Sequence, residues 1–135
     1  MRYLLDTNAL SYAFRGEGEV ARRLLAVSPT DIGIPAPVLY EARTGMLRLG
    51  PGSRRDAMLS ALDTLLREVS VAAFDAAAAE AAAQIRVELE SRGEAIGPID
   101  TQIAGIARSV GAVLVTRNTR EFGRVSGLLV EDWYQ

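Results

Sequence analysis

Carboxylates are the side chains of this sequence with the greatest capacity for chemistry. The 135 residues include neither His nor Cys, and all 15 basic residues are Arg. Nearly all common nucleophile–base pairs need His, Cys or Lys and are therefore excluded. Asp6 directly follows the mostly apolar run at residues 2–5, and Thr7 and Asn8 beside it can donate hydrogen bonds to a carboxylate. Carboxylates gathered at one point act most readily by holding a hard divalent cation, so the chemistry depends on which other acids lie near Asp6.

Short apolar runs alternate with amphipathic segments along the whole chain. Brief apolar runs predict strands at residues 2–6, 30–34, 69–71, 112–116 and 127–130. Helical spacing and flanking Gly, Pro or Asp predict helices at about residues 8–14, 18–27, 37–49, 53–67, 75–91, 100–110 and 119–123. This alternation predicts an α/β fold in which helices cover both faces of a central parallel sheet of about five short strands.

The carboxyl edge of such a sheet is the expected place for a functional crevice. In open parallel sheets the crevice lies beyond the carboxyl ends of the strands, near the point where strand order reverses. Asp6 ends the first predicted strand and Thr116 ends the fourth. If those strands are neighbours, residues 116–121 open into the same crevice as Asp6.

Each candidate acid also has a simple structural interpretation. Asp6 and Asp100 are both placed to cap the helices that follow them, and a capping acid lies where backbone N–H groups hold it ionised. Glu41 lies at the border of an apolar helix face, where a solvated glutamate is the common case and a partly inward one needs a cation. Glu121 could be an ion-pair partner on a short helix. The four acids together, rather than any one of them, favour a site.

The composition is that of one ordinary globular domain, which we expect to span residues 1–135. Hydrophobic residues make up 49% and charged residues 24% of a 14.5 kDa chain. No apolar run approaches the roughly 20 residues that span a bilayer, the N-terminus is no signal peptide, and the absence of cysteine fits the cytoplasm. With a net charge of −2 and a pI near 5.2, the protein is not a polycation that seeks nucleic acid, although individual Arg side chains remain good phosphate ligands.

The order of these motifs resembles the PIN-domain ribonucleases, and within them the VapC-type toxins of bacterial toxin–antitoxin pairs. The resemblance covers the whole chain at near-identical length. Ala42 stands where relatives often carry Leu, and Glu121 stands where many have Asp. The matching stretches are residues 5–8 (Leu-Asp-Thr-Asn), Glu41, residues 97–100 (Gly-Pro-Ile-Asp), residues 114–122 (Leu-Val-Thr-Arg-Asn-Thr-Arg-Glu-Phe) and residues 127–133.

The resemblance implies a three-layer PIN-like domain with an acidic catalytic pocket for Mg²⁺ or Mn²⁺. Oxygen ligands suit these ions, whereas zinc normally takes His or Cys. A ribonuclease mechanism based on two His residues is excluded by composition alone. The resemblance implies catalysis for Asp6, Glu41, Asp100 and Glu121, with Asp6 and Asp100 as metal ligands. Candidate supporting residues are Thr7, Asn8, Thr116 and Asn118. Three residues flank the site as candidate RNA contacts, or serve only solubility and local salt bridges: Arg117, Arg120 and Arg124.

The same resemblance implies partners. These are an RNA substrate, a small VapB-like antitoxin, and a second copy of the chain in a homodimer formed through helices in the 18–67 region, with a hetero-oligomer when the antitoxin binds. Two other classes of protein compete with this interpretation. A phosphoryl-accepting receiver domain has the same sheet class but relies on a Lys that this chain lacks. A catalytically silent module that binds RNA or protein is the remaining alternative, and a metal-dependent cleavage assay separates it from a nuclease.

Overall fold

Five short parallel strands form the centre of the molecule, and a computed structural model describes them and all other residues, Met1–Gln135. The strands are β1 (Tyr3–Leu5), β2 (Ile32–Pro35), β3 (Ser70–Ala72), β4 (Val113–Val115) and β5 (Leu129–Glu131). Their order in the sheet is β3-β2-β1-β4-β5, with every pair parallel. The α/β class and the parallel sheet predicted from the sequence are confirmed.

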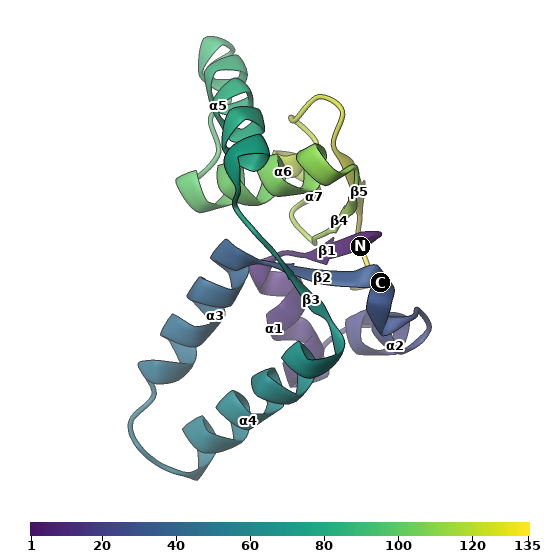
Figure 1. Cartoon of the computed structure of the whole chain (residues 1–135), viewed down its shortest axis with the longest axis vertical. Helices are drawn as coiled ribbons and strands as arrows, with labels where there is room; N and C mark the ends of the chain where they lie inside the picture. Colours follow the sequence, from purple (N-terminus) through teal and green to yellow (C-terminus); the bar gives the residue numbers. More distant parts are fainter.

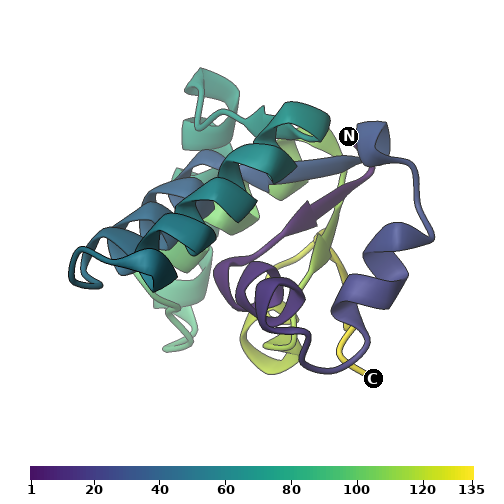
Figure 2. The ribbon, with the colours of Figure 1, turned by 90° about the horizontal axis from the view of Figure 1, so that it is seen from below.

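Helices cover the sheet on both faces. The elements α1 (Thr7–Arg15), α2 (Val20–Leu25), α3 (Ala36–Leu47) and α4 (Ser53–Glu68) lie below it in Figure 1, while α5 (Ala76–Ser91) and α6 (Pro98–Val110) lie above. The shorter α7 (Thr119–Phe122) connects β4 to β5. Figure 2 shows α3 and α4 side by side as a helical hairpin. No helix is long and apolar enough to cross a bilayer.

The two helical layers follow from the direction in which the chain adds strands. It adds β2 and then β3 on one side of β1, and it then returns to place β4 on the other side. Because crossovers between parallel strands are right-handed, reversing the direction moves the connecting helices to the opposite face. The point where the order reverses therefore lies between β1 and β4, at the strand ends that carry Asp6 and Thr116.

The core lies between the sheet and both layers. Leu4, Leu5, Ile34 and Leu114 have no exposed surface, as expected for strands covered on two faces. On the upper layer α5 and α6 pack so closely that a Cβ added at Gly105 would lie 2.7 Å from the Cβ of Ala82. The alanine-rich sequence of α5 therefore provides a flat face for close helix packing.

Some predicted boundaries are wrong by a few residues. Residues 29–31 form a 3₁₀ turn before β2, and Pro35 lies inside that strand. Residues 127 and 128 precede β5, because Gly127 turns the chain with a φ of 75°. The predicted helix at residues 18–27 is shorter at both ends.

Candidate active site

Asp6 lies at the point where strand order reverses, and its carboxylate is held from two sides. Its backbone N–H donates to the carbonyl of Val115 at 3.1 Å, which fixes the end of β1 against β4. Oδ1 accepts from the backbone N–H of Ala9 at 2.8 Å, and Oδ2 accepts from the hydroxyl of Thr116 at 2.5 Å. Asp6 is therefore both the N-cap of α1 and a residue of the crevice, and the capping role does not exclude a role in a site.

The environment of Asp6 favours a nearby cation. Only 4% of the residue is exposed, and this burial raises the pKa of its carboxyl group. The hydrogen bonds from Thr116 and Ala9 lower that pKa, and the charge of Glu41 raises it, with a net rise above 3.8. A buried carboxylate of this kind is costly to ionise without positive charge beside it.

Asp100 lies in the first turn of α6, but it is not the cap of that helix. The N-cap is Gly97, and Pro98 takes the first helical position, where its missing N–H costs nothing. The predicted capping role of Asp100 is therefore wrong. The pKa of Asp100 is raised to about 6, mainly by burial and then by the charges of Asp6, Glu121 and Glu41 in that order. All three other candidate acids are thus close enough to act on this one carboxyl group.

Glu41 and Glu121 are each held by a neighbouring polar residue. The hydroxyl of Thr7 donates to Oε1 of Glu41, which connects the first turn of α1 to α3. The side-chain amide of Asn118 donates to Oε2 of Glu121 at 3.0 Å, and its backbone N–H donates to the hydroxyl of Thr116 at 2.9 Å. A chain of hydrogen bonds therefore runs from Asp6 through Thr116 and Asn118 to Glu121.

Three of the four acids, Asp6, Glu41 and Asp100, border one polar hollow, which we call the acidic hollow. Neither Thr116 nor Glu121 lines the hollow. Thr116 is buried and donates a hydrogen bond to Asp6, and Glu121 accepts one from the side chain of Asn118. None of the four acids forms an ion pair with an Arg. The residues that line the acidic hollow are Asp6, Thr7, Asn8, Glu41, Asp100, Asn118 and Phe122.

The donor set of the acidic hollow fits a hard cation that keeps part of its water shell. In this conformation no three acids converge closely enough to coordinate one ion by themselves. Mg²⁺ usually keeps several waters and binds through one or two carboxylates, so a pair such as Asp6 and Asp100 meets its requirement. Burial is the largest cause of the raised pKa values of Asp6 and Asp100, and a bound cation would offset it by favouring the charged carboxylates.

The three candidate RNA-binding Arg residues have different surroundings. Arg124 is committed to the protein, because it pairs with the carboxylate of Glu94 at 3.7 Å and donates to its carbonyl at 3.3 Å. Arg120 is exposed on α7 and forms no ion pair. The guanidinium of Arg117 lies 3.6 Å from the ring centroid of Tyr134. The sequence prediction did not include this aromatic partner, since nothing in local spacing connects residues 117 and 134.

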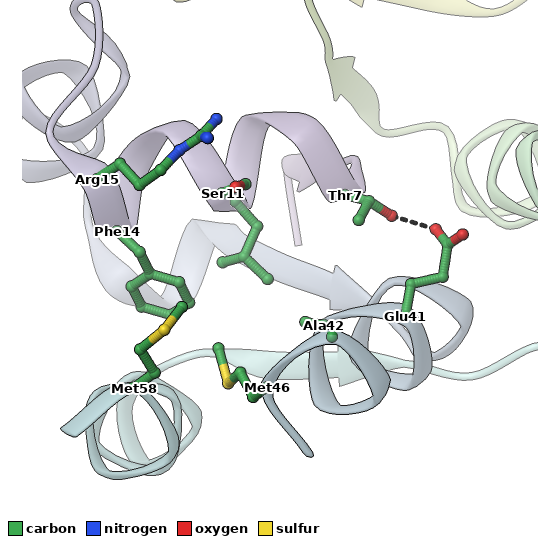
Figure 3. Close-up of a pocket in the computed structure, with 10 residues that line it drawn as sticks. Thr7, Ser11, Phe14, Arg15, Glu41, Ala42, Met46 and Met58 are labelled. Carbon is green, nitrogen blue, oxygen red and sulfur yellow. Dashed lines mark hydrogen bonds between the residues drawn. The ribbon is translucent and has the colours of Figure 1, made fainter. Parts of the chain in front are cut away.

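A second, mostly apolar hollow begins where the acidic hollow ends, and we call it the apolar groove. Figure 3 shows the hydrogen bond between Thr7 and Glu41 at one end of it, with Phe14 and Met58 at the other. Thr7 and Glu41 border both hollows, so the two adjoin. The sequence prediction missed this groove, whose lining residues are Thr7, Leu10, Ser11, Phe14, Arg15, Glu41, Ala42, Gly45, Met46 and Met58.

Known proteins resemble this chain over nearly its full length. Residues 3–128 match the family described as the PIN domain. The tRNA(fMet)-specific endonuclease VapC of Shigella flexneri is 35% identical over 133 residues, which cover 98% of each chain. Two solved structures also match, VapBC2 of Rickettsia felis bound to a promoter DNA fragment and DNA-bound VapBC of Salmonella typhimurium. The first has a TM-score of 0.87 at 32% identity and covers 98% of this chain and 99% of that chain. The second has a TM-score of 0.85 at 30% identity and covers 98% of both.

Proposed function

Because this chain belongs to the PIN-domain family, and within it to the VapC-type ribonucleases, we propose that it is an Mg²⁺- or Mn²⁺-dependent endoribonuclease and the toxin of a toxin–antitoxin pair. The observation that carries the metal dependence is the acidic hollow itself. Four carboxylates act on one another there, two with raised pKa values and none with an Arg partner. Such an arrangement needs a cation from outside the chain.

The acids and their hydrogen-bond partners have different proposed roles in hydrolysis. Asp6 and Asp100 are the proposed ligands, and Glu41 and Glu121 add negative charge around them. When bound, Mg²⁺ or Mn²⁺ activates water for attack on a phosphodiester and offsets the charge that develops in the transition state. Ala9 and Thr116 fix the orientation of Asp6, and Thr7 fixes that of Glu41. This pre-organisation keeps Asp6 and Glu41 aligned without rearrangement.

The substrate class of the proposal is RNA. The relative from Shigella flexneri is named for its specificity toward tRNA(fMet), so that tRNA is the first substrate to test beside unstructured RNA. Phosphates approaching the acidic hollow meet the charges of Asp6, Glu41 and Asp100, so a bound cation is needed for RNA binding as well as for cleavage. We expect the protein to act in the cytoplasm, where these RNAs are found.

A small VapB-like antitoxin is the proposed partner, and the apolar groove is its proposed docking place. The solved relatives from Rickettsia felis and Salmonella typhimurium are described as VapBC assemblies. Phe14, Met46 and Met58 offer an apolar path that leads directly to Glu41. An arm of the antitoxin that follows this path could place an Arg or Lys among the acids, where it would replace the cation and block the substrate.

A homodimer is also part of the proposal, with α3 as its centre. Tyr40 and Leu47 are 65% and 58% exposed and lie seven residues apart on the same face of that helix. Both belong to the 18–67 region predicted to form the interface. Binding of antitoxin would then give a hetero-oligomer. Sedimentation of wild type beside Tyr40→Arg tests this, since a charged residue in the interface should produce monomers.

The activity is tested with purified protein on tRNA and on unstructured RNA in Mg²⁺ or Mn²⁺. We expect cleavage that EDTA stops and that Asp6→Asn abolishes. Asp56→Asn is the matched control, because it makes the same chemical change at an exposed position of α4. If all three proteins bind RNA and none cleaves it, the chain is the catalytically silent binding module instead. Cleavage by Asp6→Asn at the wild-type rate would show that the acidic hollow is not the active site.

A further inference from the structure

A cluster of two tyrosines and one arginine lies directly beside the acidic hollow. Arg117 stands in the sequence between Thr116, which donates to Asp6, and Asn118, which lines the hollow. The ring of Tyr12 lies 4.9 Å from that of Tyr134 in an edge-to-face arrangement. The guanidinium of Arg117 lies 3.6 Å from the centroid of Tyr134 and 5.7 Å from that of Tyr12. We call these three residues the Arg–Tyr cluster.

The helix α1 connects this cluster to the acidic hollow. Asn8 is exposed and lines the hollow, and Tyr12 follows it by four residues, so both lie on the same face of α1. Four residues correspond to a rise of about 6 Å along a helix. Thr7, Ser11 and Phe14 instead line the apolar groove. Two surfaces therefore leave the hollow along two sides of α1, one carrying Arg and aromatic side chains and one mostly apolar.

The guanidinium of Arg117 is held by the two tyrosines, but no carboxylate of the protein pairs with it. Arg117 is exposed and forms no ion pair, whereas Arg15, Arg43 and Arg92 among others are paired with carboxylates. The guanidinium lies 3.6 Å from the ring centroid of Tyr134, and both tyrosines raise the pKa of Arg117, so it stays charged. The planar fork of a guanidinium matches the oxygens of a phosphate.

The C-terminal residues are anchored to the rest of the protein without Arg117. The carbonyl of Tyr134 accepts from the backbone N–H of Glu19 at 2.8 Å. Gly18, with a φ of 62°, lets the two backbones meet so closely that an added Cβ would lie 2.5 Å from that carbonyl oxygen. Trp133 is buried, with its ring 5.0 Å from that of Tyr3. The tail is therefore anchored by contacts that do not involve the guanidinium.

We propose that the Arg–Tyr cluster binds the RNA strand next to the cleaved phosphodiester, with Arg117 forked to a flanking phosphate and Tyr12 stacked on the adjoining base. This rests on the proposed ribonuclease function of the acidic hollow. Arg and aromatic side chains together are the usual means of holding single-stranded RNA, because stacking tolerates any base and the cation follows the backbone. A cation fixed beside the hollow also offsets the repulsion between its acids and the incoming phosphates.

The test measures binding of a fluorescent single-stranded RNA oligonucleotide with non-hydrolysable phosphonate linkages by anisotropy in Mg²⁺, so that the acidic hollow keeps all of its carboxylates. Arg117→Ala should weaken binding on the order of tenfold, as expected for one charge-assisted hydrogen-bonded contact, and should reduce the slope of log affinity against log salt by about one. Arg117→Lys should restore the salt slope but not the full affinity. Tyr12→Leu should weaken binding by roughly fivefold or more through the lost stack.

Arg86→Ala is the matched control, since it removes the same charge from α5 at a residue that borders neither the acidic hollow nor the Arg–Tyr cluster. With cleavable RNA, Arg117→Ala should raise KM more than it lowers kcat, whereas Arg86→Ala should change neither. If Arg117→Ala and Arg86→Ala weaken RNA binding equally, the effect comes from net charge alone and the proposal is overturned. If the wild-type protein cleaves RNA and Arg117→Ala binds RNA as tightly as wild type does, the proposal is also overturned. The ribonuclease function then stands. A wild-type protein that neither binds nor cleaves RNA would overturn both.

Discussion

The hydroxyl of Thr116 donates a hydrogen bond of 2.5 Å to the carboxylate of Asp6, although 110 positions separate the two residues in the sequence. The contact exists because β1 and β4 are neighbours in register, with Leu5 opposite Val115. It is one of the causes that lower the pKa of Asp6 against the effect of burial. Thr116 therefore favours the ionised form of a buried acid.

Thr116→Val should shift the acidic limb of the pH–rate profile to higher pH. Valine has the same shape but donates no hydrogen bond, so the pKa of Asp6 should rise further. The change also removes the acceptor for the N–H of Asn118, and we expect a stability loss of about 1–3 kcal/mol. Thr116→Ser keeps the hydroxyl and should retain the wild-type profile. Identical pH profiles for Thr116→Val and wild type would contradict this role.

Asp100 should make the metal-free protein less stable as pH rises. Its pKa is about 6 in the folded state, against 3.8 ordinarily, so between these values the folded state binds more protons than the unfolded state. Stability from this group is therefore highest below about pH 4, falls as pH rises through 6, and stays low above it. Asp100→Asn should gain about 1 kcal/mol relative to wild type at pH 7.5 but not at pH 4, allowing for screening of a half-exposed group. Urea denaturation at both pH values measures this, and an equal gain at both would contradict the assignment.

Saturating Mg²⁺ or Mn²⁺ should raise the melting temperature at matched ionic strength. An ion bound only by the folded protein stabilises it by mass action, and here it also relieves repulsion among the acids. The shift should be larger at pH 7.5 than at pH 5, because a protonated Asp100 competes with the cation. Asp6→Asn should lose most of the shift and Asp56→Asn none of it. The same shift in all three proteins would indicate unspecific binding.

Much of this architecture could be predicted from the sequence because the signals are local. Brief apolar runs and helical spacing predicted the parallel α/β sheet, and the position of Asp6 after a strand predicted the crevice. The cap of α6 was predicted wrongly, since Gly97 and Pro98 begin that helix two residues before Asp100. The Gly-Pro pair was the available signal, because Pro favours the first helical position. The contact of Arg117 with Tyr12 and Tyr134 could not be predicted, since tertiary packing alone brings these three residues together.

Two glycines in helices should respond to alanine in opposite ways. At Gly105 a Cβ would lie 2.7 Å from that of Ala82, and overpacking between α5 and α6 should cost about 1–3 kcal/mol. At Gly45 a Cβ would meet nothing within 4 Å, and its helical backbone suits alanine, so the free energy of unfolding should rise by about 0.4–1 kcal/mol. Chemical denaturation of both variants checks the pair. Equal effects would show that α5 and α6 are less closely packed than described.

The apolar groove should control inhibition without affecting toxicity. Met58 borders it from α4, beside Phe14 of α1, and Met58→Glu would place a charge where the antitoxin arm is proposed to dock. The variant should still arrest growth, which shows that it folds and cleaves RNA, but co-expression of the small neighbouring open reading frame should no longer relieve the arrest. Val87→Glu is the control, because Val87 is 66% exposed on α5 and lies outside the groove. Relief of both variants to the wild-type extent would place the antitoxin on another surface, whereas selective loss with Met58→Glu would make the groove its route to Glu41.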